Sequence, residues 1–191
     1  LSVPLFWDEA GVYGHISYEL ADHKLSLHPK TIDQWVSRGH PLLYPNYIAL
    51  GMKIFGTNQT VAHATNLLLA VLLVIAMFVQ IRKHFSVGIA FMSCLLLMFL
   101  PNYFTQSILL LPEIALTLAL WLTTWAFIEK KWIVYFLSGA AALMIKEPAG
   151  IWIMALWFWS ILDERKRGLE MGAAVFLVKP VLPIQLMQAL R

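Results

Sequence analysis

The chain of 191 residues is 60% hydrophobic and only 13% charged, and its formal net charge is +3. Soluble domains are about half apolar and about a quarter charged, and disordered chains have low hydrophobicity and high charge, so the composition excludes both classes. The single cysteine, Cys94, excludes a disulfide framework and a thiolate metal site. The mild, dispersed charge excludes nucleic acid as a partner. Because the apolar residues come in long runs, we expect an all-α polytopic membrane protein.

Residues 1–60 are the polar part of the chain and hold four of its six histidines. The stretch 9–20 is predicted to form an amphipathic helix. Large apolar residues recur at helical spacing over 44–55, which indicates a helix lying along the membrane surface. A turn and helix-start signals follow at 56–60. We therefore expect residues 1–60 to form a long external loop that carries juxtamembrane helices.

Residues 61–167 are predicted to hold the transmembrane helices, because a run of about 20 residues crosses a hydrocarbon core of about 30 Å. Pro101-Asn102 is expected to end the second of four apolar stretches, and 146–148 breaks the fourth. We interpret the fourth stretch as a hairpin of two short helices, which gives five helical segments. The predicted stretches are about 61–81, 85–100, 108–128 and 132–162.

Three basic clusters give the topology, because basic residues near spans favour the cytoplasmic side. The hairpin is required to bring the third cluster to the same side as the other two. Residues 1–60, the segment 101–112 and the tip Lys146-Glu147 then lie outside together. The clusters are Arg82-Lys83, Lys130-Lys131 and Arg165-Lys166-Arg167.

Residues 168–191 have a different character. A short buried strand is predicted over 172–180, ending in Lys179-Pro180, and a small amphipathic helix over 182–190. This α/β-like tail resembles the last strand and helix of a response-regulator receiver domain, in which a Lys-Pro pair follows the strand. The phospho-acceptor aspartate of such a domain is absent, so we expect neither a functional domain nor signalling activity.

Acidic residues next to the predicted outer face are the candidates for chemistry. Asp8-Glu9 follow an apolar run, Glu113 begins a span and Glu147 lies at the hairpin tip. Carboxylates near hydrocarbon are costly and usually functional. Together they could deprotonate an acceptor or hold a divalent metal; each could instead be an interface residue or a helix cap. Lys146 could bind a lipid phosphate, although spacing alone favours its pairing with Glu147.

Two patterns that contain histidine could have a structural role instead of a role in binding. His40-Pro41 with Tyr44 forms a rigid polar-aromatic turn, which by itself is a loop terminator. A second pattern places three residues on one helix face, as zinc ligands can be, but no second segment supplies further ligands. We favour a solvated face there and assign no metal ligand. The three residues are His15, Glu19 and His23.

The order of three motifs resembles the first external loop of the GT-C glycosyltransferases, which include the dolichyl-phosphate-mannose protein mannosyltransferases and the bacterial aminoarabinose lipid A transferases. Pro112-Glu113 and Lys146-Glu147-Pro148 also look like that family, and the resemblance covers roughly residues 3–165. The three motifs are Phe6-Trp-Asp-Glu9, Gly39-His-Pro-Leu-Leu-Tyr44 and Leu50-Gly-Met-Lys-Ile-Phe-Gly56.

The resemblance implies GT-C-like transmembrane helices and an enzyme of the bacterial inner (plasma) membrane whose active face is periplasmic or extracellular. It would transfer a sugar, with inversion, from a polyprenyl-phosphate donor to a lipid or protein acceptor, among membrane lipids. Asp8 would be the catalytic base or orient the acceptor, with Glu9 as its partner and Glu113 as the second acidic position. The implied substrate-binding residues are His40, Tyr44, Lys146 and Glu147.

Members of that family are much longer, so we expect this chain to be an N-terminal fragment that is inactive alone. A second interpretation is a segment of a polytopic transporter or channel in which Glu113, Lys146 and Glu147 line a pathway. Transporters usually show paired halves with broken helices, and this sequence shows no such pairing. A third interpretation is a non-catalytic scaffold whose acidic residues are structural.

Overall fold

A computed structural model describes residues 5, 8–32, 34–37 and 39–170. All regular structure in these ranges is helical, as the sequence predicts. The chain divides into two compact units, Leu1–Ala149 and Gly150–Arg191, and the first is called the N-terminal unit below. The strand and helix predicted in the tail lie outside the described residues.

The external segment begins with a π-helical turn, η1 (Glu9–Tyr13), that continues directly into α1 (Gly14–Asp22). A Cβ on Gly14 would collide with the carbonyl oxygen of Glu9, so only glycine fits where the wide turn joins the α-helix. These two elements cover the amphipathic helix that the sequence predicts over 9–20.

Three further helices complete the external segment. The short η2 (Pro29–Thr31) and α2 (Gln34–Ser37) lead to α3 (Leu43–Phe55). The last of these coincides with the helix predicted over 44–55. Its Gly51 lies against Thr65 of the next helix, α4, so closely that a Cβ on Gly51 would collide with the threonine side chain.

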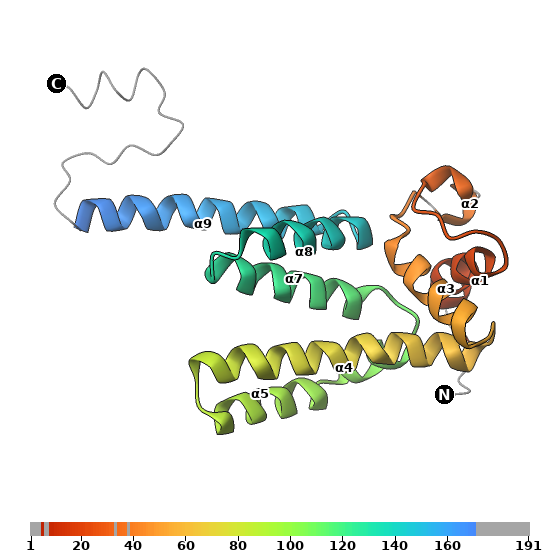
Figure 1. Ribbon diagram of the computed structural model, residues 1–191, viewed down its shortest axis with the longest axis horizontal. Coiled ribbons are helices and arrows are strands. Elements are labelled where there is room, and N and C mark those ends of the chain that lie inside the picture. The colour runs from red at the N-terminus through yellow and green to blue at the C-terminus, as the bar shows by residue number, and fades with distance from the viewer. Residues whose placement is uncertain (1–4, 6–7, 33, 38, 171–191) are drawn as a thin grey trace, which may run out of the picture. The chain divides into compact units, whose positions relative to one another are not determined.

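The longest helix of the N-terminal unit is α4 (Gln59–His84), with 26 residues. The Asn58 side chain caps it by accepting a hydrogen bond from the Val61 N–H at 2.9 Å. Basic residues in its last turn complement the negative end of the helix dipole. By length and composition α4 can cross a membrane. Figure 1 shows α1 and α3 at one end of α4, with α5 and α7 beside it.

The second apolar stretch forms two helices, α5 (Val87–Phe99) and α6 (Pro101–Ile108), bent by 69°. Helix α5 ends at Phe99, just before the Pro101-Asn102 pair that is expected to end the second apolar stretch, and a separate helix follows. Proline at the first helical position lacks only an N–H that has no partner inside the helix, so Pro101 can open the new helix. Within the described residues, this bent pair is a second candidate span beside α4.

Shorter apolar helices follow. The helices α7 (Glu113–Ile128) and α8 (Trp132–Ile145) pack against each other, and the Thr123 hydroxyl donates to the Ser138 hydroxyl at 2.9 Å between them. The chain breaks after α8, at the predicted 146–148, and α9 (Ala149–Glu170) begins. An apolar helix over 149–163 belongs to this last element.

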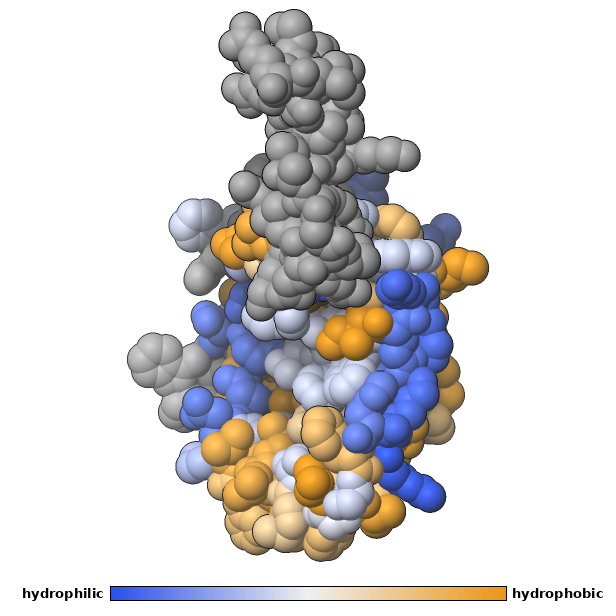
Figure 2. Space-filling model, turned by 90° about the vertical axis from the view of Figure 1, so that its left-hand side faces the viewer, coloured by the Kyte–Doolittle hydropathy of each residue, from blue (hydrophilic) through white to orange (hydrophobic). Residues whose placement is uncertain are grey.

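The lateral surfaces of α5 and α8 carry large apolar side chains that face outward. Phe99 is 80% exposed, Ile133 77% and Leu137 69%. Continuous exposed apolar surface is unusual in a soluble monomer and is typical of a membrane or protein contact. Figure 2 looks onto the end of the molecule where α4 turns into α5 and α7 into α8, and apolar and hydrophilic side chains gather there in separate areas.

Glu129 joins two of the predicted basic clusters at that end. Its carboxylate receives Lys83 Nζ at 2.6 Å and Lys131 Nζ at 2.6 Å. His84 stacks on Trp125, with ring centroids 4.9 Å apart. Hydrogen bonds from Lys131 and then Lys83 lower the pKa of Glu129 from 4.5 to about 2. The clusters at 82–83 and 130–131 therefore lie at the same end of the N-terminal unit.

Gly51→Ala should destabilise the contact between α3 and α4. Overpacking of this kind costs about 1–3 kcal/mol, and Thr65→Ala should restore most of the loss because it removes the colliding atoms. A Cβ added to Gly11 would meet no atom within 4 Å, so Gly11→Ala is the matched control and should be neutral. The measurement is the unfolding temperature in detergent. Equal losses for both glycine variants would contradict this packing.

Glu129→Gln should remove a stabilisation that depends on pH. Because the pKa of Glu129 is lowered on folding, its ion pairs stabilise the fold above about pH 4.5 and are lost as the pH falls through about 2. The unfolding temperature of the wild type should thus exceed that of the variant at pH 7, and the difference should vanish near pH 2. Glu19→Gln, at a carboxylate without a salt bridge to any described residue, should show no such trend. A difference that stays constant down to pH 2 would refute the assignment.

Candidate functional site

Tyr13 ends the π-helical turn of the predicted external segment. This buried side chain stacks on the His40 ring, with centroids 6.2 Å apart, and meets Tyr44 edge-on at 5.9 Å. The loop before α3 therefore contacts the π-helical turn through aromatic rings. The sequence placed His40 and Tyr44 in one turn motif, and the structure brings both to Tyr13.

Three carboxylates act on the hydroxyl of Tyr13. Its pKa is raised to about 12, first by burial and then by the negative charges of Glu113, Asp8 and Glu147. Electrostatic effects of this kind fall off over several ångströms, so these residues from three distant segments gather around one side chain. Three of the four predicted acidic residues thus contribute to raising the pKa of this one tyrosine.

Lys146 and Glu113 form an ion pair between the end of α8 and the start of α7. Lys146 Nζ lies 2.8 Å from Glu113 Oε1, and the two side chains are 30% and 38% exposed. The expected pairing of Lys146 with Glu147 is wrong: Glu147 instead lies 4.0 Å from His40 Nδ1. Adjacent side chains diverge where the backbone is extended, as it is at Lys146.

Asp8 and Glu9 are neighbours in sequence but occupy opposite environments. Asp8 precedes η1, is exposed and makes no capping hydrogen bond with its side chain. Glu9 is 0% exposed, and its Oε1 accepts a hydrogen bond from the Leu110 N–H at 2.7 Å. The structure therefore leaves Asp8 accessible to solvent and places Glu9 inside the protein.

Two buried residues of α4 were not among the predicted site residues. His63 Nδ1 lies 2.6 Å from the Ile108 carbonyl oxygen and 3.5 Å from Glu9 Oε1. Asn66, one turn further, accepts a hydrogen bond from the Tyr44 hydroxyl at 3.0 Å. Polar residues in an otherwise apolar helix are a recognisable signal of function or buried pairing, and this signal could have identified both.

Burial also changes the pKa of Tyr44. It is almost fully enclosed, and burial, followed by the negative charges of Glu113 and Glu9, raises its pKa well above 10. Its hydroxyl therefore remains protonated and donates to Asn66. Tyr44 thus supplies one face of its ring to the site and anchors α3 to α4 with its hydroxyl.

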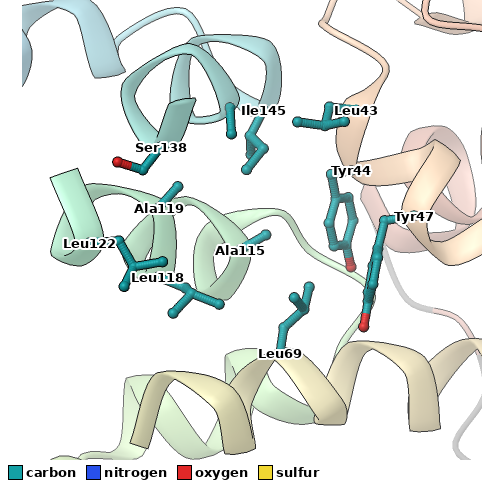
Figure 3. A pocket seen from close by; sticks show the side chains of 11 residues that line it. Leu43, Tyr44, Tyr47, Leu69, Ala115, Leu118, Ala119, Leu122, Ser138 and Ile145 are labelled. Carbon is teal, nitrogen blue, oxygen red and sulfur yellow. The ribbon is translucent and has the colours of Figure 1, made fainter. Parts of the chain in front are cut away.

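An apolar cavity of about 300 Å³ lies between α3, α4, α7 and α8. Figure 3 shows Tyr44 and Tyr47 on one side, Leu69 below, and Ala115 and Ala119 opposite. The tyrosine hydroxyls bond to Asn66 and to the Thr65 carbonyl, which leaves their rings to line the space. Such a cavity suits a hydrocarbon ligand.

The cavity is adjacent to the charged residues along the chain. Ala115 follows Glu113 by two residues, and Ile145, which also lines the cavity, directly precedes Lys146. Tyr44 lines the cavity, and the negative charge of Glu113 contributes to raising its pKa. A ligand with a hydrocarbon chain and an anionic head could therefore contact both.

The histidine face of α1 is the remaining metal candidate from the sequence. His15 and His23 are exposed, and the His23 ring contacts the backbone oxygen of Glu19 at 3.2 Å. Over the part of the chain that the structure describes, no group of three or more His, Cys, Asp or Glu residues is placed to hold a metal ion.

Comparison with known proteins gives one match. Residues 39–184 match the family described as dolichyl-phosphate-mannose-protein mannosyltransferase, which is well over half of the chain. The matched segment includes His40, Tyr44, Glu113, Lys146 and Glu147. Comparisons with curated proteins and with solved structures found no match.

Proposed function

This chain belongs to the dolichyl-phosphate-mannose-protein mannosyltransferase family, whose members are membrane glycosyltransferases that use a lipid-phosphate-linked sugar, and on that premise we propose how its own residues serve the reaction. The proposed reaction transfers a sugar, with inversion, from a polyprenyl-phosphate donor to a lipid or protein acceptor on the outer face of the membrane. The observation that carries it is the ion pair of Lys146 and Glu113, together with an apolar cavity lined by Ile145 and Ala115, which lie one and two residues from the pair along the chain.

Lys146 is the proposed contact for the donor phosphate. The phosphate gains negative charge as its bond to the sugar breaks, and a nearby cation stabilises that charge in the transition state. Glu113 holds Lys146 Nζ in place at 2.8 Å, so the cation does not have to be ordered when the donor binds. Glu147, beside His40, borders the same region.

Asp8 is the proposed catalytic base. The acceptor hydroxyl oxygen attacks the anomeric carbon from the side opposite the phosphate, and its proton passes to the Asp8 carboxylate. The bond between that carbon and the phosphate oxygen breaks, and its electron pair leaves with the phosphate. One displacement of this kind inverts the anomeric centre. Asp8 fits this role because it is exposed, whereas Glu9 is buried.

The apolar cavity is the proposed site for the first isoprene units of the carrier. Its volume of about 300 Å³ is at the lower end of the range for ligand pockets. It is about twice the volume of apolar cavities that stay dry and bind benzene. A hydrocarbon chain would therefore enter it without displacing well-bound water. The family match gives no support to the alternative interpretation as a transporter or channel segment.

Asp8→Asn should abolish most sugar transfer. We expect a loss of about 10²–10⁴-fold, because the acceptor loses its base. The assay measures transfer from a polyprenyl-phosphate sugar in membranes that contain the full-length protein. Asp22→Asn, at an exposed carboxylate of α1, is the matched control and should keep full activity. Near-normal transfer by a folded Asp8→Asn protein would remove Asp8 from catalysis.

Ala119→Leu should weaken donor binding by filling the cavity. Excluding about two methylene groups from apolar contact costs about 0.8 kcal/mol each, so the KM for the donor should rise about tenfold while kcat changes little. Ala140→Leu, on the exposed face of α8, adds the same volume away from the cavity. The cavity assignment fails if the two variants have the same KM.

A further inference from the structure

The loop between α6 and α7 is held by side chains from two distant segments. Glu9 Oε1 accepts a hydrogen bond from the Leu110 N–H at 2.7 Å, a contact that spans about half of the chain. His63 of α4 contacts the Ile108 carbonyl oxygen at 2.6 Å. Both side chains are 0% exposed, so no water competes for these contacts and each is stronger than it would be at a surface.

His63 is held through one ring nitrogen. Its Nδ1 faces the Ile108 carbonyl oxygen at 2.6 Å and Glu9 Oε1 at 3.5 Å. Because a carbonyl oxygen only accepts hydrogen bonds, Nδ1 carries a proton. The other nitrogen, Nε2, is buried and has no hydrogen-bond partner among the residues that the structure describes. The ring is therefore oriented by its contacts with the loop and with Glu9.

Asn66 extends the same contact by one helical turn. Its Nδ2 lies 2.7 Å from the Leu109 carbonyl oxygen and 3.2 Å from those of Gln106 and Ser107. Its Oδ1 accepts from the Tyr44 hydroxyl. The backbone of 106–110 is thus bound by three side chains that come from the start of the chain and from α4.

From this placement we propose that Glu9 and His63 are positioning residues, which fix the 108–110 loop and thereby set the distance between Asp8 and the Glu113–Lys146 pair. Glu9 directly follows Asp8, and Leu110 precedes Glu113 by three residues. The Glu9–Leu110 hydrogen bond therefore ties the segment that carries the base to the segment that carries the phosphate-binding pair. This role rests on the function proposed above, and it assigns Glu9 no contact with substrate.

Conservative variants separate positioning from acid–base chemistry. Glu9→Gln keeps an oxygen at Oε1 for the Leu110 N–H, and His63→Asn keeps a donor close to the position of Nδ1. Both should retain kcat within about tenfold of the wild type. Glu9→Ala and His63→Leu remove the contacts, and each should lower kcat about 10²-fold, the cost of a misplacement of about 1 Å.

Two outcomes of the activity assay would overturn the proposal. If Glu9 were the base, Glu9→Gln would lose about 10²–10⁴-fold, as Asp8→Asn is expected to, and the acid limb of the pH–rate profile would change. A positioning role leaves that limb in place. The proposal would also be contradicted if His63→Asn lost as much activity as His63→Leu. The donor that asparagine retains would then not be what positions the loop.

Hydrogen exchange of the 106–113 peptide gives a readout that does not need activity. The Leu110 amide should be protected in the wild type, in Glu9→Gln and in His63→Asn, and should exchange at least tenfold faster in Glu9→Ala and His63→Leu. Unchanged exchange in Glu9→Ala would refute the positioning role. A different result would separate the two proposals: the wild type transfers no sugar from any polyprenyl-phosphate donor, while the wild type and the variants show the expected exchange rates. The proposed function would then be wrong, and the role of Glu9 and His63 in fixing the loop would be supported.

Discussion

Polar groups enclosed by apolar helices must find their partners inside the molecule, because neither hydrocarbon nor a dry interior supplies them. This constraint shapes the N-terminal unit. The last carbonyl groups of α6 and the backbone of 109–110 lie where the helical hydrogen bonds stop, and they bond to Glu9, His63 and Asn66. The Tyr44 hydroxyl joins the same network. These contacts attach the external segment to α4 and to the start of α7, where the charged residues of the site are placed.

The candidate site combines a charged part and an apolar part. Glu113 and Lys146 neutralise one another, and residues next to them along the chain line a cavity whose walls are almost entirely apolar. A preformed cation next to an apolar space matches a ligand that is itself divided into a phosphate and a hydrocarbon chain. The start of the π-helical turn adds exposed Asp8, the residue before it, and the turn itself ends on buried Tyr13.

The sequence predicts most helices because their apolar runs and breaks are local properties. The helix over 44–55 and the break at 146–148 both appear where the residues indicate. The helix before Pro101 ends as the residues indicate, but the sequence does not predict that Pro101 also opens a second helix. Contacts between distant segments were harder to predict: spacing favoured Glu147 for Lys146, whereas α7 brings Glu113 to it. The pattern Asp8-Glu9 cannot show which carboxylate turns inward, since that depends on the fit of Leu110.

The π-helical turn at Glu9–Tyr13 has a consequence for how this surface can change. Such a turn holds one more residue than an α-helical turn, and each residue of a helix rotates the chain by about 100°. Loss of a single residue between Glu9 and Gly14 would therefore swing the preceding carboxylates around the helix axis while α1 stayed packed. The inward acid would leave its hydrogen bond to the Leu110 backbone. An insertion or deletion in this short stretch would therefore change the direction in which the preceding side chains point, as well as the length of the segment.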